Sequence, residues 1–487
     1  MNWNRLATAV TSRRSWAWAV LVALASGLLM ALAGGGDSAS QSPVSLPGSA
    51  ESARAAALAK DFPGGDRAPA ILVVTRTDGT PLTPDDHAAA DAARSRIEGS
   101  PLTVSTDGMA ALAAVPLDTN LSGFALNDAV KSLRTNATTG LPDGLLAQVT
   151  GGPAFGADIA NAFAGANITL LAVTAAVVAV LLILTYRSPV LWLVPLLVIA
   201  FADRVGAVAG AALTSAVGLT ADGSTAGITS VLVFGAGTNY ALLLISRYRE
   251  ELRRSRDHRA ALHTAVRTAG PAIVASNATV VLALLTLLFA SAPSTRSLGV
   301  QAATGLVVAA LFSLLVLPPL LALCGVRLFW PFVPHPGDSD TVTTGAWHRI
   351  AAGVARRPVM VATASILLLG VLAIGILGTP TGLSQTEQFR VKAESVSGYD
   401  AVAAHFPGGL TDPTRVIGST GRAEELQRAI VDTPGVVSAT EAGRTDGGLV
   451  QWAVVTDAAP ATGQAFETVE ALRDSVRSAD PGAVVGG

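Results

Sequence analysis

Seven long apolar stretches constrain this chain more than any other feature of its sequence. Each approaches the roughly 20 apolar residues that a helix needs to cross the hydrocarbon core of a bilayer. Two long polar segments, 35–167 and 379–487, lie between or after them. We therefore expect a polytopic α-helical membrane protein with seven spans and two external domains. The apolar stretches are Trp16–Ala33, 168–186, 190–213, 227–246, 271–290, 298–323 and 359–377.

The composition agrees with a membrane protein and argues against several other classes. Of the 487 residues, 50% are hydrophobic and 14% are charged, whereas soluble domains carry about 25% charged residues. The net charge of −2 provides no basic field for nucleic acid. The single cysteine, Cys324, excludes a disulfide framework, and no zinc-ligand spacing, phosphate-binding loop or catalytic constellation is recognisable. We expect no enzyme, no cofactor, no metal site and no nucleic-acid partner.

The placement of arginine predicts how the spans are oriented. The segment 247–267 holds seven arginines against three acids, and cytoplasmic loops are enriched in Lys and Arg. If the spans alternate, the N-terminus lies on the same side as this segment, and both polar segments lie on the other. We therefore expect a multi-pass protein of the plasma (inner) membrane, with a cytoplasmic N-terminus and extracytoplasmic domains.

The first apolar stretch has two interpretations. Arg5, Arg13 and Arg14 precede a run that ends with Ala31, Leu32 and Ala33, and this order is also typical of a cleavable signal peptide. The alternative is a retained span, which an internal repeat favours.

The repeat divides the chain into two halves. The sequence Asp-Phe-Pro-Gly-Gly at 61–65 is followed 344 residues later (405 minus 61) by His-Phe-Pro-Gly-Gly at 405–409. Adding the same offset to the residue numbers of the first apolar stretch gives those of the seventh to within one residue. Similarity at a fixed offset indicates an internal duplication. The first half continues into five further spans. We expect a chain that stops before the matching spans of its second half, and whose partner is a C-terminal half or a second copy.

These patterns together predict six segments. The segment 344–356 within the linker is predicted to be an amphipathic helix on the inner membrane surface, and a plain linker is the alternative. The segments are a first span (1–34), an external domain (35–167), a five-span bundle (168–326), a cytoplasmic linker (327–358), a seventh span (359–378) and a second external domain (379–487).

Both external domains interleave helices with strands, which is typical of a split βαβ, or ferredoxin-like, arrangement. The helix expected at 84–98 has a capping residue in Thr83, and Pro84 suits its first position. The other expected helices are 127–136, 423–432 and 465–477, and the expected strands are 70–75, 110–115, 145–151, 415–419, 435–439 and 449–456.

Polar side chains inside the apolar stretches are the candidate functional residues, because they are costly in a membrane. Asn239 and Tyr240 lie near the middle of the fourth stretch, where they serve either transport or hydrogen bonding between helices. Ser276 lies in the fifth stretch. Asp203 and Arg204, in the third, are interpreted as a neutralising ion pair near the outer interface, with an ion or substrate site as the alternative.

Two glycines precede these residues on the fourth stretch. Gly235 and Gly237 lack side chains, so they would allow a neighbouring helix to approach closely. We interpret both as helix-packing residues.

A family resemblance rests on these motifs. The sequence Gly-Ala-Gly-Thr-Asn-Tyr-Ala-Leu-Leu-Leu at 235–244, followed by Ser-Arg-Tyr-Arg-Glu-Glu at 246–251, resembles the signature of MMPL-type transporters, the actinobacterial branch of the resistance–nodulation–division superfamily. The segments 185–189, 202–205 and 269–273 are also similar. The resemblance implies twelve spans, two external porter domains and proton-driven export of lipids or other hydrophobic compounds.

One residue departs from the family pattern. The resemblance assigns the coupling proton to an acid at the position of Asn239, with Tyr240 beside it and Ser276 in the same relay. An amide side chain does not titrate, so the implied relay is interrupted at its central residue. The function implied is export of a lipid or hydrophobic small molecule through the membrane. The alternatives are a lipid- or sterol-sensing receptor-like protein that does not transport, and an inactive fragment.

Overall fold

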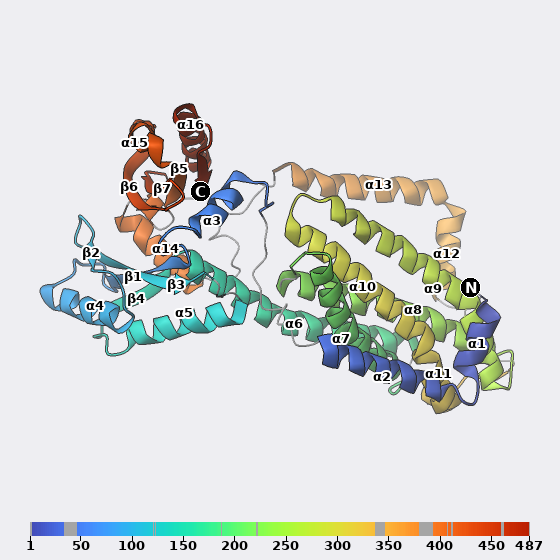
Figure 1. Cartoon of the computed structure of the whole chain (residues 1–487). Helices are drawn as coiled ribbons and strands as arrows, with labels where there is room; N and C mark the ends of the chain where they lie inside the picture. Colours follow the sequence, from blue (N-terminus) through green and yellow to red (C-terminus); the bar gives the residue numbers. More distant parts are fainter. Residues whose placement is uncertain are drawn as a thin grey trace.

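The computed structural model consists of a helical bundle and two small antiparallel sheets (Figure 1). Helix α6 runs from the sheets into the bundle (Figure 1). The first six apolar stretches lie in helices of the bundle, the seventh forms a helix outside it, and the two sheets are built from residues of the two polar segments. The structure describes residues 2–33, 46–119, 121, 123–186, 188–220, 223–336, 346–378, 393–406, 408–410, 413–458 and 462–486.

Five helices of the described chain are long and apolar enough to cross a membrane. They begin or end within a few residues of five of the seven expected stretches. The first expected stretch forms α2, which makes an angle of 93° with the short helix α1 that precedes it. The second lies within α6, where residues Ala172–Leu184 form a shorter apolar helix segment. The five are Leu193–Ala216, Ser224–Leu252, His258–Phe289, Pro293–Phe329 and Pro358–Leu377.

Small residues bring the helices of the bundle together. A Cβ atom placed on Gly206 would lie 3.1 Å from the Cα atom of Gly305, and one on Gly210 would lie 3.3 Å from the Cα atom of Gln301. Helices in membranes pack closely where small residues face each other. The bundle elements are α1 (Trp3–Thr11), α2 (Trp16–Ala33), α6 (Gly152–Tyr186), α7 (Leu193–Ala216), α8 (Gly223–Leu252), α9 (His258–Leu285), η2 (Thr286–Phe289), α10 (Pro293–Leu315), α11 (Leu317–Cys324) and η3 (Gly325–Phe329).

Two further helices follow the bundle. The expected amphipathic helix is present as α12 (Ala346–Arg356), with Ile350 and Val354 exposed one turn apart. Helix α13 (Pro358–Ile374) has no buried residue among those described. Its apolar side chains therefore face away from every described part of the protein.

The first polar segment forms a four-stranded sheet in the order β2-β3-β1-β4, with antiparallel neighbours. Helix α4 begins as expected, because the Thr83 hydroxyl accepts from the Asp86 amide and the Asp86 carboxylate accepts from the Thr83 amide. This first sheet domain contains β1 (Arg67–Arg76), α4 (Pro84–Arg96), β2 (Thr103–Val104), β3 (Ala110–Asp118), α5 (Gly123–Thr138) and β4 (Leu145–Thr150).

The second sheet domain repeats this plan in the order β6-β7-β5-β8. Strand β6 is longer than expected from the sequence, since it continues past Ala439 to Arg444. Its pairing with β7 is irregular between Val436 and Ser438 and again between Glu441 and Gly443. Its elements are β5 (Thr414–Ser419), α15 (Ala423–Val431), β6 (Val436–Arg444), β7 (Leu449–Thr456), α16 (Gly463–Ala479) and β8 (Val484–Gly486).

The two sheet domains exchange helices. Helix α3 (Glu51–Ala59) precedes the first sheet domain in the chain but packs on the second, where its Ala55 belongs to one buried apolar cluster with Ile417. Helix α14 (Glu394–His405) precedes the second but packs on the first, where its Val402 belongs to one buried apolar cluster with Ile71. Figure 1 shows α3 beside the second sheet domain and α14 beside the first. On each sheet, one apolar face is covered by helices of the same domain and the other by a helix from the other half of the chain.

Candidate functional site

The Tyr240 side chain links α8 to α9 inside the bundle. It is 2% exposed, and its hydroxyl donates a 3.2 Å hydrogen bond to Oδ1 of Asn277. Ser276, which is exposed, also interacts with the Tyr240 hydroxyl. The structure therefore brings Tyr240 and Ser276 together and adds Asn277, a buried amide.

Asn239 lies on a different side of α8. It is exposed, and so are Gly235 and Leu243, which lie four residues before and after it on the same helical stripe. Within the described chain, this stripe has no helix packed against it at Asn239. The residue at the implied proton position is therefore adjacent to Tyr240 in sequence but does not face the Tyr240–Asn277 hydrogen bond.

The two glycines of the motif have different surroundings. A Cβ atom on Gly237 would lie 2.9 Å from Cδ1 of Ile199 on α7 and 3.4 Å from Cβ of Ala309 on α10. A Cβ atom on Gly235 would meet no atom within 4 Å. Gly237 is therefore a position at which α7, α8 and α10 approach each other, whereas Gly235 is not.

Asp203 and Arg204 form an ion pair on α7. The Arg204 guanidinium donates to Oδ2 of Asp203 from Nη2 at 2.6 Å and from Nε at 3.1 Å. The Asp203 side chain is 2% exposed and the Arg204 side chain 56%.

The position of this pair along α7 bears on the expected ion pair. We expect the pair near the outer interface, on a stretch starting at residue 190, and this stays a prediction. Helix α7 begins at Leu193 and continues for 24 residues, so the pair lies within about one residue of the helix midpoint, roughly 15 Å from its start. Charges inside a membrane span are costly, and the partner on the same helix reduces the cost.

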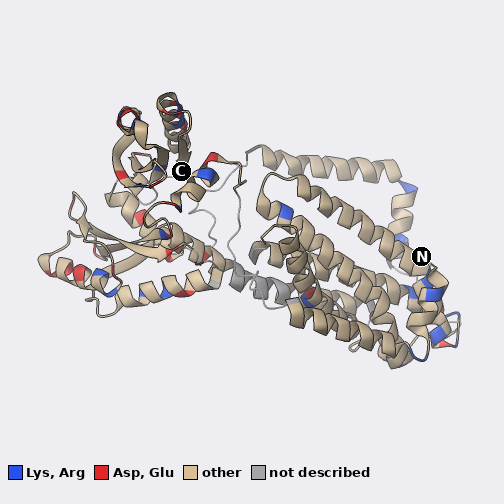
Figure 2. Cartoon of the chain, in the orientation of Figure 1, with Lys and Arg blue, Asp and Glu red and all other residues tan. Residues whose placement is uncertain are grey.

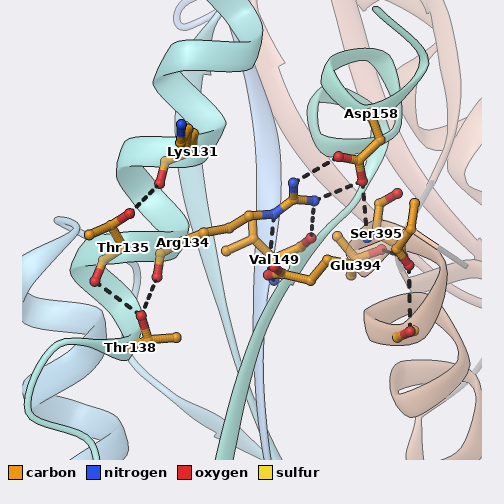
Figure 3. A network of polar contacts seen from close by, with 11 residues as sticks. Lys131, Arg134, Thr135, Thr138, Val149, Asp158, Glu394 and Ser395 are labelled. Carbon is orange, nitrogen blue, oxygen red and sulfur yellow. Dashed lines mark hydrogen bonds and ion pairs between the residues drawn. The ribbon is translucent and has the colours of Figure 1, made fainter. Parts of the chain in front are cut away.

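A second polar cluster, missed by sequence reasoning, lies where α6 leaves the first sheet domain (Figure 3). Arg134 of α5 donates to both carboxylate oxygens of Asp158 on α6, at 2.7 and 2.8 Å. Its Nε lies 3.2 Å from Oε1 of Glu394 on α14. The same Glu394 oxygen accepts from the Val149 amide at 3.0 Å, and the Ser395 amide donates to Asp158 at 3.2 Å. The guanidinium of Arg134 on α5 therefore contacts both α6 and α14.

The cluster holds its charges although it is largely buried. The side chains of Arg134 and Asp158 are 18% and 10% exposed. Burial disfavours both charged forms, but the attraction between the two groups outweighs it: the pKa of Asp158 is lowered and the pKa of Arg134 is raised. The ion pair is therefore present across the physiological pH range.

A similar set of contacts holds the exchanged helix α3. We call it the α3 clasp, and we call the contacts of Arg134, Asp158 and Glu394 at the start of α14 the α14 clasp. Glu51, the first residue of α3, accepts from the Val485 amide of β8 at 2.9 Å and pairs with Arg473 and Arg477 of α16. In both clasps, a glutamate at the start of the exchanged helix meets an edge-strand amide and an arginine of the host domain. The signal in the sequence was a glutamate opening each alanine-rich stretch before the repeated Phe-Pro-Gly-Gly motif.

The opposite end of α14 is held by a histidine. His405 Nδ1 lies 2.7 Å from Oδ2 of Asp107 in the turn before β3. The Ser105 hydroxyl, the Met109 amide and His405 lower the pKa of Asp107 to about 2.

Among the described residues, no group of three or more His, Cys, Asp or Glu side chains could hold a metal ion.

Comparison with known proteins identifies relatives. The model of the MMPL family matches residues 44–361. The chain is 38% identical to the membrane protein ActII-3 of Streptomyces coelicolor over 89% of this chain and 62% of that protein. It is 28% identical to the apo-petrobactin exporter of Bacillus anthracis, over 78% of this chain and 56% of the exporter. It is 29% identical to the transport protein MmpL10 of Mycobacterium leprae, over 59% and 28% respectively. The chain thus spans about three fifths of the length of the first of these relatives.

Proposed function

The chain belongs to the MMPL family, and from this we propose that it is a multi-pass membrane transporter or the transporting part of one. Members of this family move molecules across membranes and are not enzymes. The match to the family over residues 44–361 is the observation that carries the proposal, since it includes both the bundle helix α8 and the whole first sheet domain.

We place seven spans in the plasma (inner) membrane, with the N-terminus in the cytoplasm and both sheet domains outside. Five long apolar helices, the bent α1–α2 pair and the apolar part of α6 supply these spans. Figure 2 supports the orientation, because lysines and arginines gather at the end of the bundle far from the sheets, whereas charges of both signs cover the sheet domains. The strand order β2-β3-β1-β4, repeated in the second sheet, supports ferredoxin-like porter domains.

A lipid or another hydrophobic compound is the substrate we propose, captured by the sheet domains and moved outward. One of the relatives is named as an exporter of apo-petrobactin. The exposed apolar side chains of α13 lie where lipid would contact the protein.

Proton coupling through position 239 is the feature we expect this chain to lack. Asn239 cannot exchange a proton, whereas the buried Tyr240–Asn277 bond remains in place. Lipid binding without coupled movement is therefore the second candidate function, and Asn239 is the observation that favours it.

Reconstitution into liposomes tests these proposals. A fluorescent NBD-labelled phosphatidylethanolamine is placed in one leaflet, and its movement is followed with and without a pH gradient. We expect movement that exceeds that of protein-free liposomes and does not respond to the gradient. Asn239→Asp should introduce a response only when the expected C-terminal half is supplied as well, and Asn239→Gln, which keeps a neutral amide, should not introduce one in either case. Binding of the lipid without movement would favour the receptor-like function, and neither binding nor movement would refute lipid handling.

A further inference from the structure

Helix α6 connects the bundle to the sheet domains as a single element. It is 35 residues long, or about 50 Å at 1.5 Å per residue. Near its end in the bundle, Leu182 is fully buried in the same core as α8. Near its start, Asp158 is part of the Arg134 cluster. A displacement of the helix inside the bundle therefore reaches Asp158.

The group that Asp158 contacts across the domain boundary is the start of α14. The Ser395 amide donates to Asp158 Oδ2 at 3.2 Å, and Arg134 is shared between Asp158 and Glu394. Along the chain, α14 leads into β5 of the second sheet domain. One short path of contacts thus connects a bundle helix to the second sheet domain.

The α3 clasp lacks such a connection among the described contacts. Glu51 meets Arg473, Arg477 and Val485, all within the second sheet domain. The two clasps are alike in how the helix is held but differ in whether a bundle helix takes part. Both sets of contacts can therefore stabilise the fold, but only the contacts around Asp158 can also connect the sheet domains to the bundle.

We propose that Asp158 is a positioning residue that transmits displacement of α6 to α14 and, through α14, to the second sheet domain. Moving the carboxylate by an ångström or two would break its bonds to Arg134 and to the Ser395 amide in a buried site, so α14 follows instead. This deepens the proposed transport function and rests on it for its purpose. The mechanical link itself can be measured without transport.

Hydrogen exchange of the full chain in lipid nanodiscs tests the first part of the proposal. Asp158→Asn keeps the size of the side chain and removes its charge. We expect amides in 393–406 to exchange at least about tenfold faster, the minimum change for loss of a charge-assisted bond. Glu51→Gln is the matched control and should accelerate exchange in 51–59 while leaving 393–406 unchanged. Equal exchange of 393–406 in the wild type and in Asp158→Asn would overturn the proposal.

A double-mutant cycle tests transmission itself. Leu182→Ala opens a cavity beside α8 in the bundle and should change the exchange of 393–406 in the wild-type background. In the Asp158→Asn background this effect should disappear, and an effect of the same size in both backgrounds would refute transmission through Asp158. Val178→Ala, a smaller truncation on the same helix, replaces Leu182→Ala if that variant fails to fold. If lipid moves in the liposome assay but the cycle shows no energetic coupling between Leu182 and Asp158, only this inference is overturned. If the cycle shows that coupling but no lipid moves, only the proposed function is overturned.

Discussion

The substitution Gly237→Ala, with Gly235→Ala as its control, tests how the structure assigns the contacts of α8. The new methyl group at 237 would lie 2.9 Å from Cδ1 and 3.1 Å from Cγ2 of Ile199. Carbon atoms pack best at about 3.5–4.0 Å, and Ile199 is fully buried, so its side chain has little room to retreat. The same methyl group at 235 would meet nothing within 4 Å.

The difference in the free energy of unfolding between the two variants reports on the contact with Ile199. Replacing glycine by alanine inside a helix is worth up to about 1 kcal/mol, and this gain is common to both variants. Overpacking costs about 1–3 kcal/mol and applies at 237 alone. We therefore expect Gly237→Ala to be less stable than Gly235→Ala by about 1–3 kcal/mol.

Reversible unfolding in mixed micelles with increasing SDS, followed by tryptophan fluorescence, measures this difference. Ile199→Val, which removes Cδ1, should recover about 1 kcal/mol in the Gly237→Ala background beyond its effect alone. Equal stabilities of the two alanine variants, or no recovery with Ile199→Val, would refute the assignment of Gly237 as the contact glycine.

Three further outcomes follow from individual hydrogen bonds. Tyr240→Phe removes the donor to Asn277 and should lower the free energy of unfolding by about 0.6 kcal/mol, a typical value between membrane helices, in the same SDS titration. Thr83→Ala removes the cap of α4 and should destabilise that helix by about 1 kcal/mol, seen as faster amide exchange confined to 84–96. Asp107 has a pKa lowered to about 2, chiefly by the Ser105 hydroxyl, so its stabilisation is complete above the unfolded value near 3.9 and is lost as the pH falls through about 2. The difference in unfolding midpoint between wild type and Asp107→Asn should accordingly be constant above about pH 5 and shrink below about pH 4, and a difference independent of pH would contradict this.

Local features were predictable because their causes lie in adjacent residues. The apolar stretches, the strands β1 and β7 and the helix capped by Thr83 follow from side-chain patterns over a few residues. The duplicated plan was also readable, since the repeated Phe-Pro-Gly-Gly motif marks the same point in both halves. In the candidate site, the sequence identified Tyr240 and Ser276, which the structure brings within reach of each other.

By itself, then, the sequence determined which segments are apolar, which are polar, and which of them are rich in helix or strand. Only the tertiary structure decided which of them meet. Gly235 and Gly237 look equivalent in the chain, yet one faces Ile199 and the other faces no atom. The exchange of α3 and α14, and the meeting of Arg134 with Asp158 and Glu394, depend on contacts between residues far apart in sequence. Such contacts form only where the packing of whole elements brings those side chains together, and no short stretch of sequence contains that information.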